Sequence, residues 1–75
     1  MKKLGDLEVG VKGVINSFTD EALSLKFMEM GCLPGSKVMI CRKAPFGDPL
    51  VIEVPGSHLT IRKSEALSIL VQTEF

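Results

Sequence analysis

Alternation of apolar and polar residues is the clearest pattern in the second half of the chain. Val38 and Ile40 fall on one side of an extended segment, and Leu50, Ile52 and Val54 do the same in the next one. A period of two is that of a strand with one buried face. Glycines and prolines lie between such segments, as they do in turns. We therefore expect strands over residues 7–18, 36–43, 50–54, 58–62 and 69–73.

The segment after the first of these strands has the period of a helix. Leu23, Phe27 and Met30 recur at helical spacing, and Leu25 and Met28 widen the apolar stripe. A stripe of this kind normally faces the core of a globular protein. We therefore interpret Leu25 and Met28 as core residues, with exposure to a partner protein as the alternative.

Capping residues set the limits of the helical segments. Asp20 is a suitable N-cap for the helix, and Gly31 suits a left-handed C-cap, with Pro34 shortly beyond. The helix is therefore expected to end near Met30 after about three turns. Ser64 can cap a short helical turn over residues 64–68, just before the last strand.

Together these elements predict a mainly β protein. Five short strands, one inserted helix and one helical turn suit a small closed or nearly closed barrel, which leaves few strand edges exposed. Since 75 residues have room for one modest core, we expect residues 1–75 to form a single domain.

Composition narrows the classes of partner. Nine basic residues balance nine acidic ones, so the chain lacks the positive field that drives binding to nucleic acid or to an anionic bilayer. Apolar runs stay far below the roughly 20 residues of a membrane-spanning helix, and residues 1–6 do not resemble the start of a secretory signal. We expect a cytoplasmic protein that binds no nucleic acid and does not insert into the membrane.

Two cysteines and one histidine are the candidate ligands for a soft or borderline metal ion. Cys32, Cys41 and His58 show no C-x-x-C or H-x-x-H spacing, so we interpret them as two buried structural thiols and a surface imidazole. A tetrahedral site would need a fourth ligand, for which Asp48 and Glu53 are the options. We expect no resident cofactor, and the alternative is weak binding of Fe(II) or Zn(II).

Catalysis finds no support in the sequence. No spacing gathers a nucleophile, a base and an orienting acid, and no Walker-type phosphate loop occurs. The four phenylalanines are the whole aromatic content, because tryptophan and tyrosine are absent. That content leaves no aromatic groove for proline-rich peptides and no stacking platform for single-stranded nucleic acid. We expect a binding protein and not an enzyme.

Three segments resemble the signature blocks of one known family. They read MGCLPGSKV at residues 30–38, RKAPFGDP at 42–49 and VPGSHLTIRKSEA at 54–66. In this order they are similar to blocks of the FeoA family, and the resemblance covers residues 7–71. It implies an SH3-like barrel, in agreement with the number of strands expected from the periodicity. Cys32 departs from the family pattern, in which an apolar residue is commoner at that position.

The resemblance also implies a function. FeoA proteins are accessories of ferrous iron uptake beside FeoB, a membrane transporter with a cytosolic GTP-binding domain. We expect this chain, as a monomer or weak homo-oligomer, to dock on the cytosolic part of FeoB, and so to reach the inner membrane only through its partner. The alternatives are a sensor or delivery protein for Fe(II), and a barrel module related to the C-terminal domain of iron-dependent repressors.

Six residues are candidates for the docking surface. Phe46 lies at the tip of a proline-framed loop, where it either caps the barrel core, which we favour, or faces a partner. The basic residues at strand ends either meet an acidic patch on the partner or only solvate the rim, and we favour solvation. The full set of partner-binding candidates is Phe46, Leu25, Met28, Arg42, Lys43 and Arg62.

Overall fold

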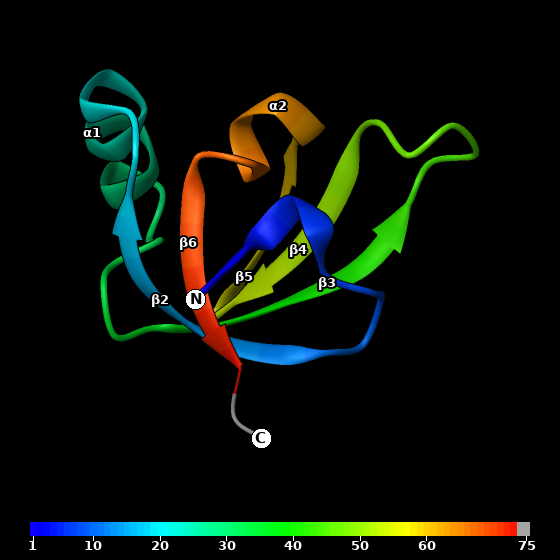
Figure 1. The fold of residues 1–75 in the computed structure, drawn as a ribbon, viewed down its shortest axis with the longest axis horizontal. Coiled ribbons are helices and arrows are strands. Elements are labelled where there is room, and N and C mark those ends of the chain that lie inside the picture. Colours follow the sequence, from blue (N-terminus) through cyan, green and yellow to red (C-terminus); the bar gives the residue numbers. More distant parts are fainter. Residues whose placement is uncertain (74–75) are drawn as a thin grey trace.

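The computed structural model describes residues 1–73 and consists of one curled antiparallel sheet with small helical segments at its ends (Figure 1). The order of the strands in the sheet is β1-β6-β2-β3-β4-β5. Along the chain the elements are β1 (Lys2–Lys3), η1 (Leu4–Asp6), β2 (Lys12–Phe18), α1 (Glu21–Glu29), β3 (Lys37–Lys43), β4 (Leu50–Val54), β5 (Ser57–Ile61), α2 (Lys63–Ala66) and β6 (Ile69–Thr73).

The mainly β class and the single inserted helix are confirmed, with differences near the N-terminus. A sixth strand, β1, pairs with β6, and the strand expected from residue 7 begins only at Lys12. Residues 8–11 form a turn instead, closed by a hydrogen bond from Val11 N–H to the Glu8 carbonyl (3.2 Å). Gly10 has φ +88° there, a conformation that ends regular pairing and that favours glycine.

Two bulges bend the sheet. The register shifts between Ile15 and Ser17 where β2 pairs with β6, and between Ile40 and Arg42 where β3 pairs with β4. A bulge inserts an unpaired residue and increases the local twist, which lets a short sheet curl around its own core. The extra residue in β3 is Cys41.

The core lies inside the curled sheet. The alternation expected for β3 and β4 is confirmed, since Val38, Ile40, Leu50, Ile52 and Val54 are all buried. The full buried apolar set is Leu4, Leu7, Ile15, Phe27, Cys32, Val38, Ile40, Leu50, Ile52, Val54, Ile61, Ala66, Ile69 and Val71.

Helix α1 begins and ends close to where its caps predict. The Asp20 carboxylate accepts a hydrogen bond from Leu23 N–H (3.1 Å), and Gly31 follows the helix with φ +96°. The helix packs on the barrel through Phe27, whose ring stacks on that of Phe18 with the centroids 6.1 Å apart. Ser24 is the other buried residue of the helix.

The interpretation of Leu25 and Met28 as core residues is wrong. Leu25 is 65% exposed and Met28 is 37% exposed. With 3.6 residues per turn, Leu25 lies about 160° and Met28 about 100° around the helix from Phe27, so both point away from the contact with the barrel. The buried stripe is therefore narrower than the apolar content of the helix suggests.

Helix α2 (Lys63–Ala66) begins two residues earlier than a cap at Ser64 predicts. Its N-cap is Arg62, and Ser64 does not cap it. The Glu65 carboxylate instead accepts a hydrogen bond from Arg62 N–H at 2.9 Å, which satisfies one of the free donors at the helix start. No helix within residues 1–73 has the length and the apolar character needed to cross a membrane.

Candidate functional site

One end of the barrel is built from α1, α2 and the loop of residues 44–49, which lie along the upper side of Figure 1. Two contacts tie these parts together. The Lys26 ammonium forms an ion pair with the Glu65 carboxylate (2.8 Å), and Lys63 N–H donates a hydrogen bond to Asp48 Oδ1 (3.0 Å). We call this region, α1, α2 and residues 44–49, the loop end of the barrel.

The 44–49 loop presents Phe46 to solvent. The side chain of Phe46 is 99% exposed, so the expectation that it caps the barrel core is wrong. Ala44 N–H donates to the Pro49 carbonyl (3.0 Å) and Gly47 N–H donates to the Ala44 carbonyl (2.7 Å). These bonds close the loop on itself, and the loop projects away from the barrel (Figure 1). Phe46 is in the middle of the loop sequence.

Basic side chains flank the base of this loop. Lys43 is the last residue of β3 and pairs with Leu50, the first residue after the loop. Leu50 also pairs with Ile61, and Arg62 follows Ile61 directly in the chain. Lys43 and Arg62 therefore both stand at strand ends beside the loop. Arg42 and Arg62 are exposed, and Lys43 is half-buried. A hollow between the loop and α2 is lined by Asp48, Pro49, Thr60, Ile61, Arg62 and Glu65.

The six candidate docking residues thus gather on elements at or beside one end of the molecule. Phe46, Arg42, Lys43 and Arg62 lie on or near the 44–49 loop, while Leu25 and Met28 lie on α1. Their common location could not be predicted from the sequence alone. It depends on the Lys26–Glu65 and Lys63–Asp48 contacts, which join segments distant in the chain.

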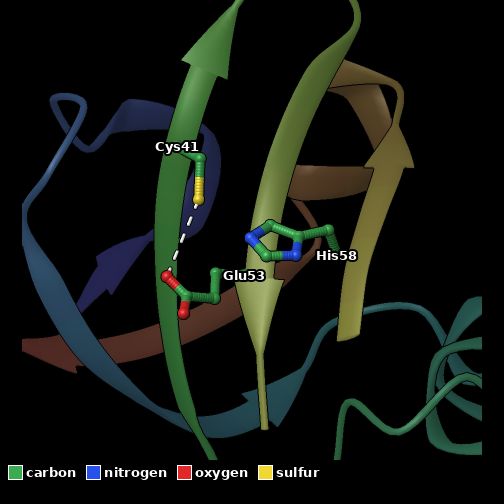
Figure 2. Close-up of side chains that lie close together, drawn as sticks. All are labelled: Cys41, Glu53 and His58. Carbon is green, nitrogen blue, oxygen red and sulfur yellow. Dashed lines mark hydrogen bonds between the residues drawn. The ribbon is translucent and has the colours of Figure 1, made fainter. Parts of the chain in front are cut away.

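A second group of functional side chains lies on the outer face of the sheet. One ligand atom each of Cys41, Glu53 and His58 lies within 4.8 Å of the other two (Figure 2). Each residue comes from a different strand, β3, β4 and β5. Glu53 and His58 are exposed, and Cys41 is half-buried.

Strand pairing explains this convergence. Glu53 and His58 are direct cross-strand partners, because β4 and β5 are joined by the two-residue turn Pro55–Gly56. Cys41 follows Met39, the other neighbour of Glu53, by two residues and therefore lies diagonal to Glu53 on the same face. The turn register could have been read from the sequence, whereas the bulge at Cys41 gives no clear sequence signal.

The two cysteines have different surroundings. The prediction of a buried thiol is confirmed for Cys32, which has no exposed surface, and is wrong for Cys41. The Cys41 thiol points to the Glu53 carboxylate, with Sγ and Oε2 3.8 Å apart. Partial burial, and then the charge and hydrogen bond of Glu53, raise the pKa of the Cys41 thiol; burial alone raises the pKa of Cys32.

Of the other three candidate metal ligands, two belong to the cluster and one does not. His58 is a surface imidazole, as expected, and Glu53 joins it. Asp48 does not join the cluster, because its carboxylate is engaged at the start of α2. Among residues 1–73, the cluster of Cys41, Glu53 and His58 is the group of side chains suited to hold a metal ion.

Solved structures with the same fold include ferrous iron transport proteins. A FeoA-like protein from Clostridium acetobutylicum is 35% identical, with 99% of this chain and 87% of that chain covered and a TM-score of 0.90. FeoA of Stenotrophomonas maltophilia, solved as a zinc complex and described as a prokaryotic SH3 domain protein, is 27% identical over 96% of this chain and 91% of that one, with a TM-score of 0.83.

A manganese-dependent transcriptional repressor shares the fold alone. It is 16% identical, and the match covers 96% of this chain but 36% of the longer repressor, with a TM-score of 0.86. The family model of the FeoA domain matches residues 2–73, which is nearly the whole chain. The SH3-like barrel is thereby confirmed, and the chain belongs to the FeoA family, whose members take part in ferrous iron transport.

Proposed function

We propose that this protein is a cytoplasmic, single-domain accessory of ferrous iron uptake that docks through the loop end of the barrel on the cytosolic part of FeoB and modulates the transporter. The observation that carries the proposal is the 99% exposure of Phe46 on a loop held by hydrogen bonds. An aromatic side chain presented by an ordered loop is a typical anchor of a protein interface.

The surroundings of Phe46 suit a protein partner. A loop that is already ordered loses little conformational entropy on binding, so more of the contact energy appears as affinity. The exposed apolar residues Leu25 and Met28 add contact area on α1. Methionine adapts its shape to different surfaces, which favours a contact that forms and breaks as the partner changes state.

Charge contributes mainly to the encounter. Arg42, Lys43 and Arg62 stand beside the loop, and exposed charges at an interface rim act on the association rate more than on the final affinity. An acidic surface on the partner is therefore the expected complement. Binding should weaken as salt is raised, since screening acts over about 10 Å at 0.1 M ionic strength.

A titration of the protein with the cytosolic domain of FeoB tests the proposal. The partner is used free of nucleotide, with GDP, and with a non-hydrolysable GTP analogue, and then as the whole transporter. Phe46→Ala is expected to weaken binding about tenfold or more, as loss of an aromatic anchor does. Val9→Ala is the matched control, because Val9 is 50% exposed on the turn before β2, outside the loop end.

Two results would remove the proposal. One is the lack of binding to both forms of the partner in every nucleotide state. The other is equal binding by the Phe46→Ala variant and the unchanged protein. A loss that is the same for Phe46→Ala and Val9→Ala would also count against it, because it would point to general destabilisation and not to a docking residue.

A further inference from the structure

The outer face of β3, β4 and β5 carries a set of side chains that docking through the loop end does not use. Cys41, Glu53 and His58 supply a thiol, a carboxylate and an imidazole from three paired strands (Figure 2). Paired strands hold their backbones at fixed spacing, so only side-chain rotation is needed to adjust the distances between the three groups.

The distances are close to those of a metal site. In a tetrahedral zinc site with the usual bond lengths, ligand atoms lie roughly 3.4 to 3.6 Å apart. Cys41 Sγ and Glu53 Oε2 are 3.8 Å apart, and no pair among the three ligand atoms exceeds 4.8 Å. The remaining adjustment of about 1 Å is within reach of rotation about the side-chain bonds of Glu53 and His58.

The chemistry of the three groups selects the class of ion. Thiolate and imidazole suit Zn(II), Fe(II) and Co(II), whereas Mg(II) and Ca(II) require sets of oxygen ligands. Three protein ligands also leave one tetrahedral position open, as in sites that exchange their metal or their fourth ligand. The exposure of Glu53 and His58 gives an ion direct access from solvent.

We propose that Cys41, Glu53 and His58 form an exchangeable three-ligand site for a borderline divalent cation, Zn(II) or Fe(II), with the fourth position open to water or another small ligand from solution. Binding replaces the thiol proton by the ion, and the proton passes to solvent, without any change of oxidation state. This site is separate from the docking proposal, and either can fail without the other.

Neighbouring charges set the expected rank of the ligands. Lys12 and Lys37 line the same hollow as Glu53, and their positive charges disfavour a cation near the Glu53 carboxylate. His58 and Cys41 do not line that hollow. Glu53 should therefore contribute less to affinity than the other two ligands.

Anaerobic titration of the whole chain with Co(II) tests the site, because a thiolate bound to Co(II) gives a charge-transfer band in the near ultraviolet. One equivalent per chain is expected to produce this band together with the visible bands of tetrahedral Co(II). Cys41→Ser should abolish the charge-transfer band, and His58→Gln should weaken binding about tenfold or more. Glu53→Gln should weaken binding less than His58→Gln does, and titration calorimetry with Zn(II) should give the same order.

Matched controls come from the same chain. Cys32→Ala removes the other thiol and Glu29→Gln removes an exposed carboxylate on α1; both should keep the band and bind within about twofold of the unchanged protein. Circular dichroism checks that each variant folds, and Cys41→Ala is a second variant should Cys41→Ser fail to do so. Because the ion binds side chains that only the folded strands bring together, saturating Zn(II) should raise the melting temperature, and a chelator should reverse that rise.

Several results would overturn the proposal. They are a Kd weaker than about 1 mM for both Co(II) and Zn(II), a cobalt spectrum without the thiolate band, or a band that Cys32→Ala removes and Cys41→Ser keeps. One ion bound per two chains would also overturn it, because the site would then need ligands from a second molecule.

Discussion

The carboxylate of Asp48 accepts a hydrogen bond from Lys63 N–H at 3.0 Å, which fastens the loop that carries Phe46 to the first residue of α2. Residues 48 and 63 are far apart in the chain, so this bond fixes where the loop stands relative to the barrel. It also satisfies a free N–H at the start of the helix. The exposed aromatic side chain is thereby held on a loop with a defined orientation.

Removal of the Asp48 carboxylate should release the loop from α2. Asp48→Ala is expected to lower the free energy of unfolding by about 1 kcal/mol, the typical net contribution of one hydrogen bond, because this bond is exposed to solvent. It should also weaken binding of the FeoB cytosolic domain, since the loop would lose order before binding. Denaturant unfolding and the partner titration measure the two effects.

The matched control for this change is Glu8→Ala, because Glu8 is an exposed acid in the turn before β2. It should alter neither stability nor binding by more than about 0.5 kcal/mol, as expected for an ordinary surface position. Equal effects of the two changes would show that the Asp48–Lys63 bond has no special role in holding the loop.

Glu65 gives the fold a dependence on pH. Its hydrogen bonds and ion pair, first with Lys26 and then with Arg62 N–H, lower the pKa of the carboxyl. A carboxyl with a lowered pKa stabilises the folded state fully above its unfolded pKa of about 4.3, and this contribution is lost as the pH falls through the lower, folded pKa. Acid should therefore weaken the link between α1 and α2.

Glu65→Gln is expected to cost about 1 kcal/mol at pH 7, because the Glu65 side chain is 17% exposed while that of Lys26 is 55% exposed and solvent screens the pair. The difference from the unchanged protein should shrink as the pH is lowered below about 4. Urea unfolding over a series of pH values measures it. A difference that stays constant over that range would contradict the role given to the charge of Glu65.

Helix α1 offers a test of which residues hold it to the barrel. Phe27→Leu should cost about 1 to 2 kcal/mol, because it removes part of a fully buried ring and its stacking with Phe18. Leu25→Ala should change stability by less than about 0.5 kcal/mol, since that side chain is mostly exposed and alanine favours the helix. Denaturant unfolding of both variants, with their m-values compared, measures the two losses of stability. A larger loss for Leu25→Ala than for Phe27→Leu would contradict this assignment of the buried face.

Much of the fold could be predicted from local patterns. The alternation in β3 and β4, the Asp20 cap and Gly31 after α1 depend on neighbours in the chain, and each is found where expected. The failures at Leu25, Met28 and Phe46 share one cause. Whether an apolar residue is buried depends on what packs against it, and for these three no distant segment does so to the extent expected.

The cluster of Cys41, Glu53 and His58 likewise depends partly on neighbours in the chain and partly on pairing between distant segments. Glu53 and His58 are brought together by a two-residue turn, a local feature that fixes their register. Cys41 reaches them because β3 pairs with β4 across a longer loop and contains a bulge, and neither the register nor the bulge can be deduced from the residues of β3 alone.

Chemical-shift mapping is the sharpest test of docking through the loop end. Isotope-labelled protein is titrated with the cytosolic domain of FeoB in each nucleotide state. Docking through the loop end should give shifts concentrated in residues 44–49, at Arg62 and along the exposed side of α1, with the 8–11 turn unchanged. Shifts confined to other parts of the barrel, or their complete absence in every nucleotide state, would contradict it.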